Sequence, residues 1–252
     1  MTSPLNLRVE DLSIRFGGHV AVDNVTCNFA PGELTVIVGP NGAGKTTLFN
    51  LISGQLAATS GKVMLGDTAL NGMSPSARAK HGVGRAFQLT NLFPRLSVLE
   101  NVRLAVQAQA GVGMRMLVRA KSLHYLEEEA RGYLEQIRLS QVADMPVSAL
   151  SHGDQRKLEV ALLLAMKPDV FMFDEPTAGM SVDEAPAILE LIEEIKQDKS
   201  KIVLLVEHKM DVVRALADRI IVLHNGALVA DGPPAEVIDL PIVREIYLGV
   251  AS

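Results

Sequence analysis

The chain has 252 residues, of which 48% are hydrophobic and 21% are charged. This length and composition are typical of a folded protein with one large domain and argue against a disordered chain. The formal net charge of −5 gives no support for a nucleic-acid-binding surface, so we expect no nucleic-acid partner. The single cysteine, Cys27, excludes an intramolecular disulfide and a metal site built from several cysteines.

Membrane-spanning and secretory segments are not expected. The N-terminus lacks a basic segment followed by an apolar one, which a signal peptide would need. The longest apolar runs, such as residues 160–166, are much too short to cross a bilayer. We therefore expect a cytoplasmic protein that meets the membrane only through a partner.

Residues 5–30 show the alternation of apolar and polar residues that predicts antiparallel strands, with a turn at Gly17-Gly18. Phe16 lies at the end of the first of these strands and leaves two interpretations open. Its ring is either a stacking partner for an adenine base or an ordinary core side chain.

A glycine-rich segment at residues 39–47, GPNGAGKTT, follows a short β-branched run at residues 34–38 and precedes a helical pattern. It fits the phosphate-binding pattern G-x-x-x-x-G-K-[ST], in which backbone N–H groups at a helix start surround the phosphates of a nucleotide. We expect Lys45 to reach the β- and γ-phosphates and the Thr46 hydroxyl to bind Mg²⁺. The alternative, a glycine-rich turn without a ligand, fits this context less well. The predicted nucleotide-binding residues of the segment are Gly39, Asn41, Gly42, Gly44, Lys45, Thr46 and Thr47.

Later elements follow the order of an α/β protein. A helix is expected to begin at Ser74-Pro75, and a mostly helical stretch of mixed charge runs from about residue 98 to 139. After that, strand and helix patterns alternate, which predicts a mostly parallel sheet with helices on both faces. The predicted strands are 170–173, 201–206 and 219–223, with helices around 188–195 and 210–216.

Two carboxylates, Asp174 and Glu175, directly follow the predicted buried strand at residues 170–173. The carboxyl end of a parallel strand faces the ligand crevice. We expect Asp174 to bind Mg²⁺ directly or through water, and Glu175 to orient or deprotonate the water that attacks the γ-phosphate. The alternative is an acidic helix start that is stabilised by the helix dipole alone.

Residues 150–156, LSHGDQR, open a further helix and carry a resemblance. They resemble the signature motif of ATP-binding cassette (ABC) ATPases, whose usual form is L-S-G-G-Q. Ser151 and Gly153 match this form, whereas His152 replaces a glycine and Asp154 the glutamine. A serine hydroxyl and N–H groups at a helix start make a second anion site, so we expect Ser151 and Gly153 to contact the nucleotide. By itself the segment would be an ordinary serine-capped helix.

Further motifs occur in the order of that family. The resemblance implies that Gln88 contacts Mg²⁺ and the nucleophilic water, and that His208 senses the γ-phosphate. A lone histidine after a strand is otherwise more often structural. Ser181 stands where the family usually has an aspartate at the end of its D-loop, which leaves open whether any carboxylate acts at this position.

The resemblance covers nearly the whole chain and implies the fold and the reaction. The fold is the P-loop NTPase fold of an ABC-type nucleotide-binding domain: α/β, mostly parallel, with an antiparallel β subdomain. A helical subdomain is expected at about residues 89–165 within a single domain of residues 1–252. The implied activity is ATP hydrolysis with ATP and Mg²⁺, by two subunits that hold each ATP between Lys45 of one and Ser151 of the other.

Several stretches are similar to the ATPases of branched-chain, or hydrophobic, amino-acid importers. These stretches are 87–88, 92–94, 99–102, 157–161 and 241–249. The implied partners are transmembrane permease subunits, received around residues 89–96, and a second ATPase subunit that is identical or related. A periplasmic binding protein is an indirect partner, and the chain is expected on the inner face of the cell membrane.

Other classes share part of this pattern. ATPases of urea importers and lipopolysaccharide exporters have some of the same stretches. A soluble ABC protein that acts on nucleic acid or ribosomes commonly has paired cassettes or long insertions, which this chain lacks. A small-molecule kinase would have no use for residues 150–156.

Overall fold

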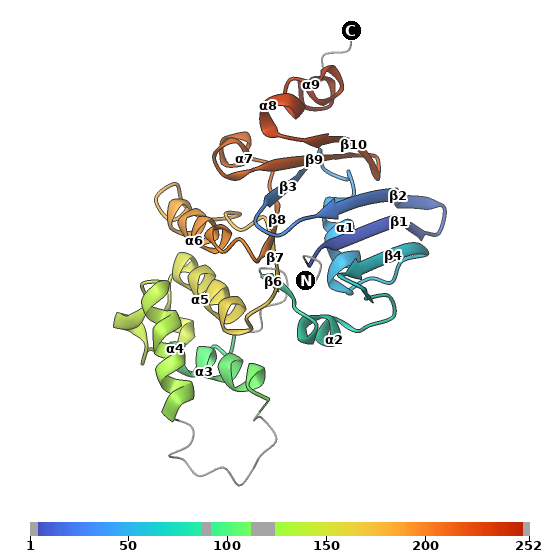
Figure 1. The fold of residues 1–252 in the computed structure, drawn as a ribbon. Coiled ribbons are helices and arrows are strands. Elements are labelled where there is room, and N and C mark those ends of the chain that lie inside the picture. The colour runs from blue at the N-terminus through green and yellow to red at the C-terminus, as the bar shows by residue number, and fades with distance from the viewer. Residues whose placement is uncertain (1–4, 87–91, 112–123, 249–252) are drawn as a thin grey trace. The chain divides into compact units, whose positions relative to one another are not determined.

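The structure, a computed structural model, describes residues 5–86, 92–111 and 124–248. The chain divides into two compact units. The first comprises residues 1–85, 169–175 and 193–252, and the second comprises residues 86–168 and 176–192. Figure 1 shows the elements of both units.

The first unit contains an antiparallel sheet of four strands in the order β2-β1-β4-β5. Every second residue of β1 is buried over much of its length, which confirms the predicted alternation. Cys27 is a buried residue of β2, and burial raises the pKa of its thiol to about 12. The strands are β1 (Leu7–Phe16), β2 (His19–Phe29), β4 (Ser60–Leu65) and β5 (Thr68–Ala69).

A second sheet has six strands in the order β10-β9-β3-β8-β7-β6. Neighbouring strands from β9 to β7 are parallel, and β10 is antiparallel to β9. All residues of β3, β7 and β8 are buried, as continuous apolar runs in a parallel sheet should be. The strands are β3 (Leu34–Val38), β6 (Val83–Ala86), β7 (Val170–Asp174), β8 (Ile202–Val206), β9 (Arg219–His224) and β10 (Ala227–Gly232).

One core joins the two sheets through helix α1 (Lys45–Ser53). Phe29 of β2, Phe49 of α1 and Met172 of β7 are fully buried members of this core. The helix that begins at Ser74 is also confirmed, since the Ser74 hydroxyl accepts a hydrogen bond from the Ala77 N–H at 3.3 Å. That helix is α2 (Pro75–Lys80), and the unit also contains α7 (Met210–Leu216), α8 (Pro234–Val237) and α9 (Pro241–Leu248).

Three helices that pack on one another dominate the second unit. They are α3 (Val98–Gln109), α4 (His124–Gln136) and α5 (His152–Ala165), and α6 (Ala185–Gln197) continues from this unit into the first. The predicted helical stretch at residues 98–139 is thus two helices, with residues 112–123 outside the described part. A functional helical subdomain at about residues 89–165 stays a prediction.

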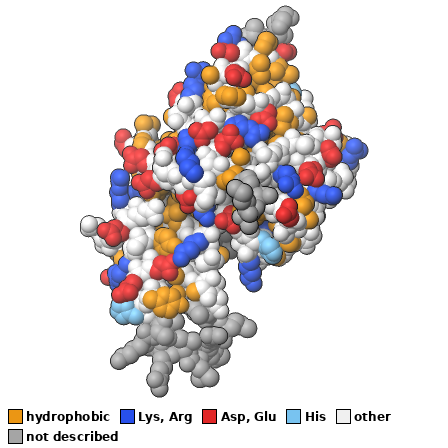
Figure 2. Space-filling model, in the orientation of Figure 1, with side chains coloured by type: hydrophobic (Ala, Val, Ile, Leu, Met, Phe, Trp, Pro, Cys, Tyr) orange, Lys and Arg blue, Asp and Glu red, His pale blue; other side chains and the backbone are white. Residues whose placement is uncertain are grey.

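The surface carries charges of both signs. On the face seen in Figure 2, Lys and Arg side chains alternate with Asp and Glu side chains over the described elements. Among the helices that the structure describes, none has both the length and the apolar character that a membrane span requires.

Candidate functional site

An open cavity of about 390 Å³ lies over the loop between β3 and α1. Its walls come from the β1–β2 hairpin, from this loop and helix start, and from the residue after β7. The lining residues are Phe16, His19, Ala21, Asn41, Gly42, Ala43, Gly44, Lys45, Thr46, Thr47 and Glu175. Residues that the sequence assigned to the nucleotide and to the attacking water thus share one cavity.

The conformation of the loop depends on glycine at two positions. Gly39 and Gly44 have φ angles of +153° and +99°. A Cβ atom on Gly39 would lie 2.2 Å from the Leu223 carbonyl oxygen, and one on Gly44 would lie 2.5 Å from the Ala21 carbonyl oxygen. Only glycine fits without a shift of the neighbouring backbone.

Helix α1 begins at the cavity without a side-chain cap. The first N–H groups of an α-helix have no partner within the helix, and the helix dipole adds partial positive charge there. The start of α1 is therefore suited to an anionic group such as a phosphate.

Lys45 is buried at the bottom of the loop. Its Nζ donates to the Gly39 carbonyl at 2.7 Å and to the Pro40 carbonyl at 3.0 Å. Burial lowers the pKa of Lys45, and the carboxylates of Glu175 and Asp174 oppose this by raising it. The ammonium group thus lies inside the loop, beside two negative charges, where phosphate oxygens could replace the carbonyls as acceptors.

Phe16 is 49% exposed and lines the cavity, so the alternative that it is a core side chain is wrong. It ends β1 opposite His19, the first residue of β2, at the turn of the hairpin. An aromatic face at the cavity wall suits a purine base. Stacking of Phe16 on adenine remains a prediction.

Glu175 follows β7 in an unusual backbone conformation. Its φ angle is +48°, in the left-handed region that non-glycine residues rarely adopt. Its N–H donates to the Val206 carbonyl at 3.0 Å, which ties the turn to the end of β8. The side chain is 42% exposed and lines the cavity, so this backbone directs the carboxylate to the open site.

His208 lies beside Glu175, and its contact with a γ-phosphate remains a prediction. Its Nδ1 is 3.8 Å from Oε1 of Glu175 and 3.6 Å from Oε2 of Glu207. Glu207 is buried and accepts hydrogen bonds from the N–H groups of His208 at 2.7 Å and Lys209 at 3.1 Å. Glu207 was not predicted from the sequence, although a carboxylate directly after a wholly apolar strand was a usable signal.

Asp174 has a different environment from its neighbour Glu175. Its side chain is 3% exposed, and its Oδ2 accepts a hydrogen bond from Nη2 of Arg85 at 2.6 Å. Arg85 was not predicted from the sequence. It is the third residue of β6, and no motif marked it.

The residues present fit the way in which proteins hold Mg²⁺ with a nucleotide. Among the described residues, no group of three or more His, Cys, Asp or Glu could hold a metal. Mg²⁺ commonly uses one or two protein oxygens together with phosphates and water, so a full protein cage is not required. The Thr46 hydroxyl, which lines the cavity, and the Asp174 carboxylate, whose charge acts on Lys45 of the same loop, are ligands of this kind, whereas Gln88 lies outside the described residues.

In the second unit, Ser151 is the N-cap of α5. Its Oγ accepts a hydrogen bond from the Asp154 N–H at 3.1 Å. Gly153 packs against Glu184, because a Cβ atom there would lie 2.7 Å from Oε1 of Glu184. The segment therefore forms the serine-capped helix start that the sequence predicted, and its contact with a nucleotide remains a prediction.

Ser181, which departs from the family's usual aspartate, has a structural function in this chain. Its hydroxyl lies 3.1 Å from Oε2 of Glu184 and accepts from the Glu184 N–H at 3.3 Å. The Ser181 N–H in turn donates to Oε2 of Glu184 at 3.2 Å. Serine and glutamate three residues apart thus form a reciprocal capping box, which was not predicted from the sequence.

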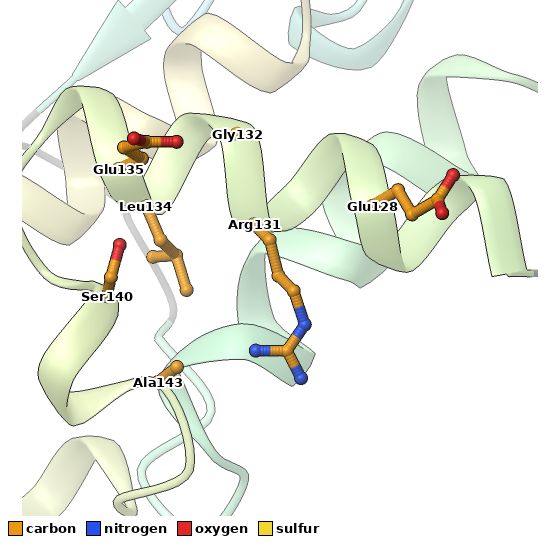
Figure 3. A pocket seen from close by; sticks show the side chains of 7 residues that line it. All are labelled: Glu128, Arg131, Gly132, Leu134, Glu135, Ser140 and Ala143. Atoms are coloured by element: carbon orange, nitrogen blue, oxygen red, sulfur yellow. The ribbon is translucent and has the colours of Figure 1, made fainter.

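A second cavity, of about 360 Å³, lies within the second unit (Figure 3). Figure 3 shows Leu134 of α4 pointing toward Ser140 and Ala143, with charged side chains around them. Arg131 on its wall is already paired with Glu127 at 2.8 Å. The residues that line this cavity include neither a glycine-rich loop nor a lysine, so the first cavity is the better nucleotide site.

Comparisons with known proteins agree with this geometry. A family model described as ABC transporter matches residues 22–178. The chain is 38% identical over 256 residues to the high-affinity branched-chain amino acid transport ATP-binding protein LivG of Escherichia coli (strain K12), with 100% of both chains covered. A crystal structure of a nucleotide-free ATP-binding cassette from an ABC transporter matches with a TM-score of 0.82 and 28% identity, over 98% of this chain and all of the other. A dimeric ATP-binding cassette bound to ADP and phosphate matches with a TM-score of 0.75 and 26% identity, over 90% of this chain and 98% of the other.

Proposed function

The chain belongs to the ABC transporter family, and we propose that it is the ATP-hydrolysing subunit of an importer for branched-chain amino acids. Identity to LivG along the whole length of both chains is the observation that supports the transport class. The cavity over the phosphate loop supports ATP as the nucleotide, because it combines an uncapped helix start, a buried lysine and a nearby carboxylate.

Each group in the cavity has a distinct task in this proposal. The loop N–H groups and Lys45 bind the phosphates, and Phe16 stacks on the base. Thr46 and Asp174 would hold Mg²⁺, with Gln88 as a third contact, and the ion supplies charge stabilisation at the phosphates when bound. Glu175 orients and deprotonates the attacking water, and His208 contacts the γ-phosphate.

The chain acts as one half of a dimer in this proposal. The related cassette that is dimeric with ADP and phosphate supports such an arrangement. Each ATP would lie between Lys45 of one subunit and Ser151 with Gly153 of the other, and hydrolysis would let the subunits part. Permease subunits would be received around residues 89–96, at the start of the helical subdomain at about 89–165. They would be moved by this opening and would keep the chain at the inner face of the membrane. A periplasmic binding protein would deliver the amino acid to them.

Replacement of Glu175 tests the reaction. A Glu175→Gln chain should retain ATP affinity, lose nearly all phosphate release and accumulate an ATP-bound dimer, because the amide cannot accept the proton of water. Glu194→Gln, at an exposed position of α6, is the matched control and should hydrolyse ATP normally. Near-normal turnover by Glu175→Gln would refute the catalytic assignment.

Transport in the native host tests the substrate class. Cells whose only copy of the chain is Glu175→Gln should fail to take up labelled leucine or isoleucine, while cells with Glu194→Gln should take them up normally. Affinity purification from solubilised membranes should recover polytopic permease subunits. Normal leucine uptake together with lost ATPase activity would retain the family but exclude this substrate class.

A further inference from the structure

A buried ion pair joins the end of β7 to β6 within the first unit. Nη2 of Arg85 donates to Oδ2 of Asp174 at 2.6 Å, and the two side chains are 6% and 3% exposed. Burial lowers the pKa of Arg85, and the hydrogen bond with Asp174 opposes this. Removal of one partner from such a pair leaves a buried charge without compensation, which is strongly unfavourable.

The guanidinium of Arg85 is also fixed by the helix that follows the phosphate loop. Its Nη1 donates to Oδ1 of Asn50 at 2.7 Å and to Oγ of Ser53 at 3.1 Å, and both residues belong to α1. Its Cζ lies 5.5 Å from the centroid of the Phe49 ring. One planar, rigid group therefore holds the Asp174 carboxylate in a set position relative to α1.

We propose that Arg85 is a positioning residue that fixes Asp174 for Mg²⁺. Arg85 occupies Oδ2, so Oδ1 is the oxygen that would meet the ion or its water. This inference rests on the proposed function, in which Asp174 acts on Mg²⁺. Without Arg85, the carboxylate would lose its fixed orientation and turn toward other donors, and this change would weaken the contribution of Asp174 to the metal.

A second arginine that contacts α1, Arg78 of α2, offers a matched control. Arg78 is also buried, and its Nη1 donates to the carbonyls of Leu51 at 2.6 Å and Ile52 at 2.7 Å. It therefore stabilises the C-terminal end of α1, and both of these acceptors are backbone carbonyls instead of carboxylates. A variant at Arg78 removes a buried guanidinium that contacts α1 and leaves the Asp174 contact in place.

The test is the Mg²⁺ dependence of nucleotide binding by the full chain, measured with a fluorescent ATP analogue. The analogue is titrated first in EDTA and then with increasing Mg²⁺. For Arg85→Met we expect unchanged affinity in EDTA and a Mg²⁺ midpoint that is about 10- to 100-fold higher, the usual effect of losing a group that orients a metal ligand. Arg85→Lys should restore part of the loss, and Arg78→Met should leave the midpoint unchanged although its melting temperature falls.

A comparison in the Asp174→Asn variant separates an effect through Asp174 from a general loss of stability. In Asp174→Asn the Mg²⁺ midpoint should already be raised, and Arg85→Lys should raise it no further if Arg85 acts through Asp174. Equal midpoints for the native chain and Arg85→Met would overturn the inference, as would a further rise caused by Arg85→Lys in the Asp174→Asn background. A native chain that binds the analogue without any response to Mg²⁺ would instead refute the proposed metal site itself.

Discussion

Two helix starts of this molecule carry predicted phosphate contacts, and they differ in how their N–H groups are satisfied. Helix α1 begins after Gly44, which has a left-handed backbone and provides no side-chain cap. Helix α5 begins after Ser151, whose hydroxyl accepts from the Asp154 N–H at 3.1 Å. The first start leaves donors at an open cavity, whereas the second satisfies one donor internally.

This difference indicates which segment can bind a nucleotide by itself. The start of α1 has its lysine and its cavity within one unit of one chain. Ser151 has an accepting contact with Asp154, but a hydroxyl also has its own proton to donate. A phosphate brought by a second subunit can therefore be bound by Ser151 without loss of the cap. Variants at the two helix starts test this difference between them.

The largest effect is expected at Lys45. Lys45→Ala removes a charged donor from the phosphates, and we expect ATP affinity to fall about 100-fold, or about 3 kcal/mol. Isothermal titration with ATP is the measurement, and Lys62→Ala, an exposed lysine of β4, is the control. If both variants bind ATP equally well, the α1 start is not the primary site.

The next effect concerns the backbone at Gly44. Gly44→Ala forces a left-handed backbone on alanine and places Cβ 2.5 Å from the Ala21 carbonyl oxygen, so we expect about 2–3 kcal/mol of lost unfolding free energy and weaker ATP binding. Gly42 has a φ angle of +81° with no atom within 4 Å of a new Cβ, so Gly42→Ala should cost only about 1 kcal/mol. Urea denaturation compares the two, and equal losses would contradict the contact with Ala21.

A smaller effect is expected at Ser151. Ser151→Ala removes a helix cap, at about 1 kcal/mol of unfolding free energy. ATP affinity of the single subunit should not change, but turnover should fall roughly fivefold if one hydrogen bond to phosphate is lost. Ser97→Ala removes the matching cap of α3, where the hydroxyl accepts from the Glu100 N–H at 3.1 Å, and should lower stability without lowering turnover. Equal turnover in the two variants would leave Ser151 as a cap only.

The smallest effect is expected at Asp154, which replaces the glutamine usual in the signature motif. Asp154→Gln removes a partly exposed ion pair with Nζ of Lys157 at 2.9 Å, so we expect a loss of about 0.3–0.5 kcal/mol. Lys157→Gln should cost the same, and the double variant should cost little more than either one. Thermal unfolding of the three variants measures this coupling, and fully additive losses would show that the pair contributes nothing.

Much of the fold was predictable because it depends on local patterns. The apolar runs at residues 34–38 and 170–173 became the buried strands β3 and β7, and the loop between β3 and α1 has the predicted strand–loop–helix context. The spacing of glycines and Lys45 within nine residues is likewise local. A pattern of this kind needs no knowledge of the rest of the fold.

Contacts between distant residues were not predictable in the same way. Arg85 and Asp174 are 89 residues apart, and only the order of strands in the sheet makes them neighbours. The exposure of Phe16 likewise depends on what the hairpin turn packs against, which alternation alone does not decide. The Ser181–Glu184 capping box was local and could have been found from its spacing.

The left-handed backbone of Glu175 sets the stability of this protein against its ATPase activity. An asparagine or glycine would adopt a φ angle of +48° at lower cost, and strain of this kind amounts to about 1 kcal/mol or more. Selection for thermal resistance alone would therefore favour the loss of this glutamate, and with it the group assigned to hydrolysis. Directed evolution of this chain for thermal stability should therefore include a screen for ATP turnover in the same round. The variants with the highest melting temperatures are expected to include inactive ones.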